Sequence, residues 1–182
     1  MPRVSVKDRL LALASAATEE FGASGYRATR TADVARRAGV SNGTLFTYVE
    51  SKEALFHLVF VVGFADVDDV LSELPMPTPG PGETLELIAQ GLRRQEVARF
   101  RLALKEDAPT DVREELQAIV EERYDMFDRL WPLLTVIERC AADLPELEAF
   151  YFSSARLRYF HQLTRYLERR VASGHLRPMP DA

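Results

Sequence analysis

The sequence predicts an all-α fold, in which an N-terminal unit of three helices is joined by a long fourth helix to a helical bundle. Apolar residues recur at steps of three and four over most of the 182 residues, and no stretch alternates with the period of two that a half-buried strand needs. Prolines and glycines stand between the periodic stretches, where helices end. With 47% hydrophobic and 28% charged residues, the composition excludes disordered and fibrous classes.

The first helix is predicted from an apolar stripe with steps of four, four, three and four residues, formed by Val6, Leu10, Ala14, Ala17 and Phe21. We expect it to end near Gly22 or Gly25. A short second helix is predicted over 32–38, where Gly39 suits the left-handed backbone that ends a helix.

Ser41 is placed to cap a third helix over 42–49, and Ser51 to cap a fourth that runs to about Leu74. The fourth helix is apolar on more than one side and should therefore be buried between neighbours. The next segment, PMPTPGPG over 75–82, is predicted as a loop. Further helices are expected over 83–105, 111–130, 132–142 and 145–173, with Pro109, Pro132 and Pro145 between them.

The second and third helices, joined by a tight turn at a glycine, have the pattern of a helix-turn-helix that reads DNA in the major groove. The contact between them is expected from five apolar residues, namely Val34, Ala35, Ala38, Val40 and Leu45. The outward face of the third helix then carries side chains that can reach base edges or phosphates, namely Asn42, Thr44, Thr47 and Tyr48. Lys52, at the start of the fourth helix, adds a cation for phosphate.

The charge is distributed unevenly along the chain. Residues 1–56 hold 8 Lys and Arg against 6 Asp and Glu, whereas the remaining residues hold 15 against 22. A basic N-terminal unit on an acidic protein of net charge −5 favours a specific nucleic-acid interface over indiscriminate binding.

At these residues the chain resembles the TetR family of transcriptional regulators. The stretch GYRATRTADVARRAGVSNGTLFTYVESKEALF, over 25–56, follows the family's pattern of a glycine-aromatic pair, AGVS, G-T-L-aromatic and S-K-E-x-L-F. The resemblance covers about 7–56 and implies a recognition helix containing Asn42, Gly43, Thr44, Thr47 and Tyr48. It also implies phosphate contacts from Thr29, Ser41, Tyr48 and Lys52.

The sequence departs from the family's pattern at three positions. Arg30 stands where a Thr or Ser usually caps the second helix, Phe46 replaces a common Tyr, and Val49 replaces a common Phe. Arg30 retains a charge for phosphate, and we expect the cap to come from Thr29 or Thr31.

The resemblance implies a two-part organisation, with a helix-turn-helix DNA-binding domain over 1–50, continuing into the linking helix to about 56, and a helical ligand-binding and dimerisation domain over 51–182. It further implies a cytoplasmic, one-component regulator, usually a repressor, that binds a palindromic double-stranded operator as a homodimer and is released by a small effector. The family's dimer is built from its last two helices. The chain stops at RPMPDA, where we expect these helices to begin, so we expect further residues beyond 182; the alternative is a dimer through another surface, such as the helix over 145–173.

An apolar or aromatic effector is predicted to bind among aromatic residues of the later helices, namely Phe100, Tyr124, Phe127, Trp131, Tyr151 and Tyr159, with His161 as a polar partner. Plain core packing is the alternative for each of these side chains. The alternative for the whole protein is a constitutive or protein-partnered DNA-binding regulator that has no effector.

Other classes of protein find little support in the sequence. The motifs HExxH, GxGxxG, GxSxG and the P-loop are absent, so a helical-bundle enzyme is a remote alternative and no cofactor is expected. The acidic runs at 66–69 and 121–125 lack histidine at ligand spacing, and we expect no metal site. The longest apolar run, 58–65, is too short to cross a bilayer, and the single cysteine, Cys140, is expected to be a buried, inert thiol.

Overall fold

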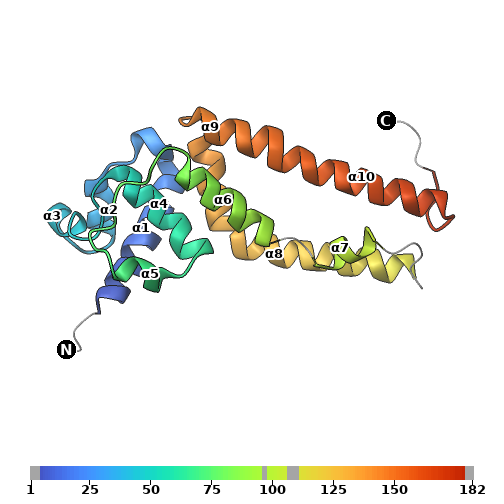
Figure 1. Cartoon of the computed structure of the whole chain (residues 1–182), viewed down its shortest axis with the longest axis horizontal. Coiled ribbons are helices and arrows are strands. Elements are labelled where there is room, and N and C mark those ends of the chain that lie inside the picture. Colours follow the sequence, from blue (N-terminus) through green and yellow to red (C-terminus); the bar gives the residue numbers. More distant parts are fainter. Residues whose placement is uncertain (1–4, 96–97, 106–110, 179–182) are drawn as a thin grey trace.

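The computed structural model describes residues 5–95, 98–105 and 111–178 and confirms the all-α prediction. The described residues form helices and turns, with one isolated backbone bridge between Val49 and Met76. The molecule is elongated: α3 lies at one end, and the two longest C-terminal helices extend to the other (Figure 1). No described helix has both the length and the apolar character that a bilayer crossing requires.

The N-terminal part contains α1 (Val6–Ala28), α2 (Thr31–Arg37), α3 (Asn42–Leu45) and α4 (Lys52–Phe64). The hydroxyl of Ser5 caps α1 by accepting the N–H of Asp8 at 3.0 Å. The helix passes through Gly22 and is interrupted at Gly25, which adopts φ 82° and ψ 176°. Because this φ lies in the left-handed region, glycine is the residue that takes it without strain.

The fourth helix is shorter than predicted. It ends at Phe64, and a separate helix, α5 (Val67–Leu71), follows before the loop. Ala65 leaves the helical conformation, and the Asp66 carboxylate accepts the N–H of Asp68 at 2.9 Å. A side chain that caps a new helix competes with continuation of the old one, which the apolar pattern alone does not reveal.

The C-terminal part contains α6 (Glu83–Arg94), α7 (Ala98–Ala103), α8 (Val112–Ala141), α9 (Pro145–Glu148), a π-helical segment η1 (Ala149–Ala155) and α10 (Arg156–Ala172). Two predicted helices, 83–105 and 145–173, are thus divided. Two others, predicted as separate at Pro132, form the single helix α8. Pro132 is exposed, so the carbonyl that loses its intrahelical donor can be hydrated, while buried Leu130, Leu133 and Leu134 hold both halves on the core.

The core is continuous between the N-terminal and C-terminal parts, because α1 packs along the C-terminal half of α8. Phe21 of α1 and Val136, Ile137 and Cys140 of α8 are fully buried. Cys140 is buried as the sequence predicts, and burial raises the pKa of its thiol to about 12. The position of the N-terminal helices is therefore set by α8 as well as by α4.

Two glycines allow α4 to approach its neighbours closely. A Cβ atom on Gly63 would lie 2.4 Å from Leu133 Cδ1 of α8, and one on Gly91 of α6 would lie 2.2 Å from Cγ of the Phe64 ring. A leucine tip can move aside, whereas the Phe64 ring is packed between α4 and α6. The α4–α6 contact thus depends on the missing side chain at Gly91.

A buried ion pair joins the far ends of α8 and α10. The fully buried Arg170 donates to both oxygens of Glu115 at 2.8 Å and to the Ala103 carbonyl at 3.0 Å. Tyr166 donates to Glu115 at 2.6 Å, and burial together with this bond raises the pKa of Tyr166 to about 12. Because both charged groups are hydrogen-bonded, the pair holds the two antiparallel helices in register.

We expect Gly91→Ala to lower the free energy of unfolding by about 1–2 kcal/mol, because overpacking against Phe64 exceeds the gain in helix propensity. Urea denaturation followed by circular dichroism measures the change. Gly80→Ala is the matched control, since the nearest atom to its Cβ would be Glu83 Oε2 at an ordinary 3.7 Å. A Gly91→Ala protein as stable as wild type would contradict the close α4–α6 contact.

Candidate nucleic-acid interface and cavity

Buried apolar side chains fix α2 and α3 relative to each other and to α1. Val34 and Ala35 of α2 and Leu45 of α3 are at most 1% exposed. Gly39, at φ 70°, turns the chain, and the Val40 N–H then donates to the Ala35 carbonyl at 2.9 Å. This is the tight glycine turn that the sequence predicts between the two helices.

Ser41 caps α3 as predicted, since its hydroxyl accepts the N–H of Thr44 at 3.0 Å. The regular helix is shorter than the predicted 42–49 and ends at Leu45. The backbone continues in tight turns, with Thr47 and Tyr48 donating to the carbonyls of Thr44 and Leu45 at 3.0 and 2.9 Å. The surface that the sequence assigns to one helix thus consists of a helical turn and the turns after it.

The loop after α5 holds the end of this segment, a contact that the sequence does not reveal. The Met76 N–H donates to the Tyr48 carbonyl at 2.8 Å, and the Glu50 N–H donates to the Met76 carbonyl at 3.0 Å. The Thr78 N–H donates to the Glu50 carboxylate at 3.0 Å. These bonds stabilise the backbone directly after the polar face of α3.

The residues predicted for the recognition helix lie in α3 and the turns after it, and α3 occupies one end of the molecule (Figure 1). Ser41, Asn42, Gly43 and Thr47 are exposed, while Thr44 and Tyr48 are half-buried. Phe46, which the sequence reasoning did not assign to the interface, is 39% exposed beside them. Phe46 directly follows the buried Leu45, so it faces away from the core, and a plot of the α3 residues around the helix axis would have shown this.

Thr29, Arg30 and Thr31, predicted to bind phosphate or to cap α2, differ in exposure and in hydrogen bonding. Thr29 is only 3% exposed, and its hydroxyl lies 2.7 Å from the Gly25 carbonyl and 3.0 Å from the Glu20 carbonyl. The Thr29 hydroxyl is therefore bonded within the protein and is not available to a phosphate. Arg30 is exposed and occupies the N-cap position of α2 without a side-chain cap bond, so neither Thr29 nor Thr31 supplies the expected cap.

The basic side chains of this region differ in how they are paired. Arg36 forms an ion pair with Asp33, and Arg37 pairs with Glu19 and Glu20, all at 2.7 Å. The Lys52 ammonium lies 3.3 Å from the Arg27 carbonyl and 4.8 Å from the centroid of the Tyr26 ring. Among the described residues, Arg30 has no carboxylate partner, which leaves its charge available to a ligand.

Tyr26 and Glu53 connect α1 to the start of α4. The Tyr26 hydroxyl donates to Glu53 at 3.0 Å, and burial raises the pKa of Tyr26 while its carboxylate partner raises it further. The pKa of Glu53 is lowered, mainly because its own backbone N–H near the helix N-terminus donates to the carboxylate. At neutral pH the phenol is thus a donor and the carboxylate an acceptor.

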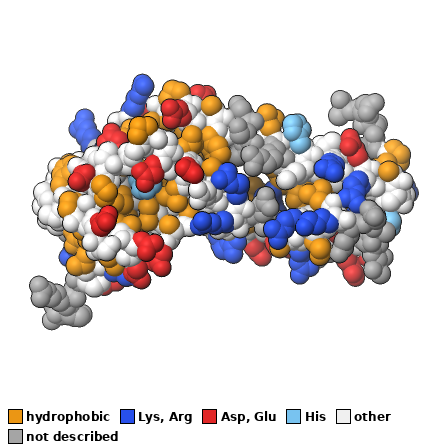
Figure 2. All heavy atoms as spheres, in the orientation of Figure 1, with side chains coloured by type: hydrophobic (Ala, Val, Ile, Leu, Met, Phe, Trp, Pro, Cys, Tyr) orange, Lys and Arg blue, Asp and Glu red, His pale blue; other side chains and the backbone are white. Residues whose placement is uncertain are grey.

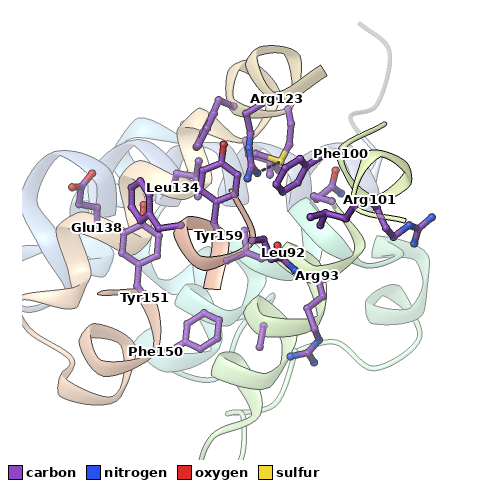
Figure 3. Close-up of a pocket in the computed structure, with 18 residues that line it drawn as sticks. Leu92, Arg93, Phe100, Arg101, Arg123, Leu134, Glu138, Phe150, Tyr151 and Tyr159 are labelled. Atoms are coloured by element: carbon purple, nitrogen blue, oxygen red, sulfur yellow. Dashed lines mark hydrogen bonds between the residues drawn. The ribbon is translucent and has the colours of Figure 1, made fainter. Parts of the chain in front are cut away.

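A cavity of about 470 Å³ lies between α6, α7, α8, η1 and α10. Phe100, Phe127, Tyr151 and Tyr159, all predicted from the sequence to line a pocket, do line it, and Figure 3 shows the Phe100, Tyr151 and Tyr159 rings around it. Leucines at 92, 104, 130 and 134 and Met126 supply further apolar wall. The volume is within the range of small-molecule sites, roughly 300–1,000 Å³.

Three residues predicted for the same pocket lie elsewhere. Tyr124 and Trp131 are 72% and 65% exposed on the outer face of α8, and His161 is exposed on α10. None of them lines the cavity. The prediction treated all the aromatics as one group, but a helix turns by 100° per residue, and the cavity wall of α8 faces a different direction from Tyr124 and Trp131.

Comparison with known proteins agrees with this geometry. Residues 13–59 match the family described as "Bacterial regulatory proteins, tetR family". Over 71 residues the chain is 34% identical to the Bacillus subtilis (strain 168) protein named "Uncharacterized HTH-type transcriptional regulator YhgD", covering 39% of this chain and 37% of that relative. The match thus spans little more than a third of the relative's length. No solved structure matches the chain.

The packing of α2 on α3 and these matches identify the N-terminal segment as a helix-turn-helix of the DNA-binding class. Within this class, residues 13–59 carry the sequence pattern of the TetR family of transcriptional regulators.

We expect Thr29→Val to lower the free energy of unfolding by about 1 kcal/mol, because the Gly25 and Glu20 carbonyls lose the one hydroxyl proton that lies between them. The salt dependence of DNA binding should stay the same, since Thr29 is buried. Thr164→Val, an exposed change on α10 far from the helix-turn-helix, is the control for replacing a hydroxyl with a methyl group. If Thr29→Val instead reduced the slope of log K for DNA binding against log salt by about one, Thr29 would be a phosphate contact after all.

Proposed function

We propose that the protein is a one-component repressor that binds a near-palindromic operator as a homodimer and is released by a small apolar effector. The observation that carries the proposal is the exposed polar surface of α3, held on a fully buried contact with α2 at one end of the molecule. Such a rigid, protruding helix with small polar side chains suits insertion into a major groove.

The environments of the residues support separate roles at the operator. Asn42 and Thr47 are exposed on the α3 surface and are assigned to base edges, where Asn pairs with adenine and Thr contacts a thymine methyl group. Ser41, Gly43, Thr44 and Tyr48 flank them, and Phe46 adds apolar contact. Arg30 is assigned to phosphate, with Lys52 and Thr31 next to it.

The dimer is proposed to form through an exposed apolar stripe on α8. Val120, Tyr124, Phe127 and Trp131 follow one another at steps of four, three and four residues, and each is at least 43% exposed. Leu157 and Phe160 of α10 are 49% and 48% exposed. A contiguous set of large apolar and aromatic side chains is typical of an interface, and a second copy provides a matching surface.

In this dimer the two α3 surfaces would contact successive major grooves, about 34 Å or one helical turn apart. Because α1 packs on the same helix that carries the stripe, the separation of the two surfaces depends on α8.

The cavity is proposed as the effector site, because its walls connect to the DNA-binding module. Ala89 and Leu92 of α6 line it, and Gly91 between them packs on Phe64 of α4. Leu130 and Leu134 of α8 also line it, and the next turns of α8 pack on α1. An effector that shifts α6 or α8 would therefore shift α4 or α1, and with them α3.

The DNA-binding proposal is tested by salt titration of binding to the DNA upstream of its own gene and to a scrambled duplex of equal length. Arg30→Gln should weaken binding to both duplexes and reduce the slope of log K against log salt by about one, because one phosphate contact is lost. Asn42→Ala should weaken only specific binding, by about 1–3 kcal/mol.

Arg94→Gln removes the same charge at an exposed position of α6, outside the helix-turn-helix. This control should leave the affinity for both duplexes unchanged. Equal affinity of the wild-type protein for the two duplexes would contradict operator recognition. A change in sequence preference on Arg30→Gln, with an unchanged salt slope, would reverse the roles assigned here.

The dimer surface is tested by the double change Tyr124→Glu with Trp131→Glu, followed by analytical ultracentrifugation. Loss of two aromatic anchors and gain of two facing charges should weaken dimerisation by at least about thirtyfold, and operator affinity should fall with it. Leu102→Glu, at an apolar residue of α7 that is 54% exposed, is the control. A double variant that remains dimeric would remove this stripe from the interface.

A further inference from the structure

Arg123 is the half-buried cation of the cavity wall, and aromatic rings hold it in place. Its guanidinium carbon lies 3.7 Å from the centroid of the Tyr159 ring and 5.5 Å from that of Phe127. Figure 3 shows the side chain of Arg123 directed toward Tyr159 inside the cavity. When a guanidinium lies with its flat face over a ring, the N–H groups in its plane stay available to an acceptor.

Among the described residues, the N–H groups of Arg123 have few hydrogen-bond acceptors. One of them donates to Met126 Sδ at 3.5 Å, and a thioether is a weak acceptor. No carboxylate of the described residues lies within ion-pair distance of Arg123, whereas Arg36, Arg37 and Arg170 each have one. A guanidinium has five N–H donors in a fork that matches a carboxylate, so Arg123 retains the capacity for a bidentate anion contact.

The rim of the cavity is also positive. Arg93 and Arg101 line it, and in Figure 3 their side chains leave the cavity and point outward, while Glu138 is the one carboxylate among the lining residues described. Figure 2 shows Lys and Arg side chains gathered over the end of α6 and over α7. On a protein of net charge −5, a local excess of positive charge at a cavity attracts an anion.

We propose that the cavity binds an apolar organic monoanion, of the aryl or alkyl carboxylate class, with its anionic group on Arg123 and its apolar part among Phe100, Phe150 and Leu134. This inference rests on the proposed function of the cavity as the effector site and names the chemical class of the effector. The anion supplies the counter-charge that a half-buried guanidinium needs, and the apolar walls bury the remainder of the molecule.

The test compares two fluorescent probes with the same ring system. 1-Anilinonaphthalene-8-sulfonate carries one negative charge, and N-phenyl-1-naphthylamine is its neutral counterpart. Fluorescence titration of the full chain should give an affinity for the anionic probe roughly 10- to 100-fold higher than for the neutral one, the value of a charge-assisted contact. Naphthalene-2-carboxylate should displace the anionic probe, and naphthalene-2-carboxamide should do so much less.

Arg123→Gln should remove the preference for the anionic probe while leaving the neutral probe bound, and Arg123→Lys should restore part of it. Arg129→Gln, an exposed change on the same helix outside the cavity, should behave as wild type. The comparison of the two probes on the wild-type protein tests the anion preference even if an Arg123 variant fails to fold.

The outcomes separate this inference from the function on which it rests. Binding of both probes with equal affinity, or an anion preference that survives Arg123→Gln, would overturn the anion class and leave the cavity as an effector site for neutral molecules. Failure of both probes and both naphthalene compounds to bind would overturn the effector function of the cavity itself, and the anion inference with it.

Discussion

The packing of α1 against the C-terminal half of α8 is the contact on which the arrangement of the molecule depends. Phe21 is fully buried there, and the Cys140 thiol lies 3.8 Å from its carbonyl. At the end of the contact, Asp143 accepts the backbone N–H of Arg27 at 2.8 Å, beside the interruption of α1 at Gly25. A Cβ on Gly25 would come within 3.1 Å of the same carboxylate.

Because of this contact, one helix orients every surface to which a function is assigned. The α3 surface packs on α2, α2 packs on α1, and α1 packs on α8. The apolar stripe and one wall of the cavity lie on α8 itself. A rotation of α8 about its axis would therefore change the α3 surface, the proposed dimer surface and the cavity together, which would give the proposed coupling a physical basis.

The sequence predicted what local chemistry determines and missed what tertiary contacts determine. Ser41 and Ser51 cap helices where expected, and Gly39 ends α2, because capping involves groups within a few residues. The continuation of α8 through Pro132 depends on burial of leucines against other helices, and the burial of Thr29 on carbonyls up to nine residues away. The sequence predicts Tyr124, Trp131 and His161 for the pocket, because the spacing of side chains shows which of them share a helix face but not which neighbouring helix that face meets.

The backbone bonds of Met76 limit how this chain can vary in length. Surface loops between helices ordinarily accept added residues at small entropic cost. The segment 75–82 differs, because Met76 and Thr78 are bonded to the end of the α3 segment, while Glu83, five residues later, begins a helix that lines the cavity. Among relatives of this protein, insertions and deletions between α5 and α6 should therefore be confined to 79–82.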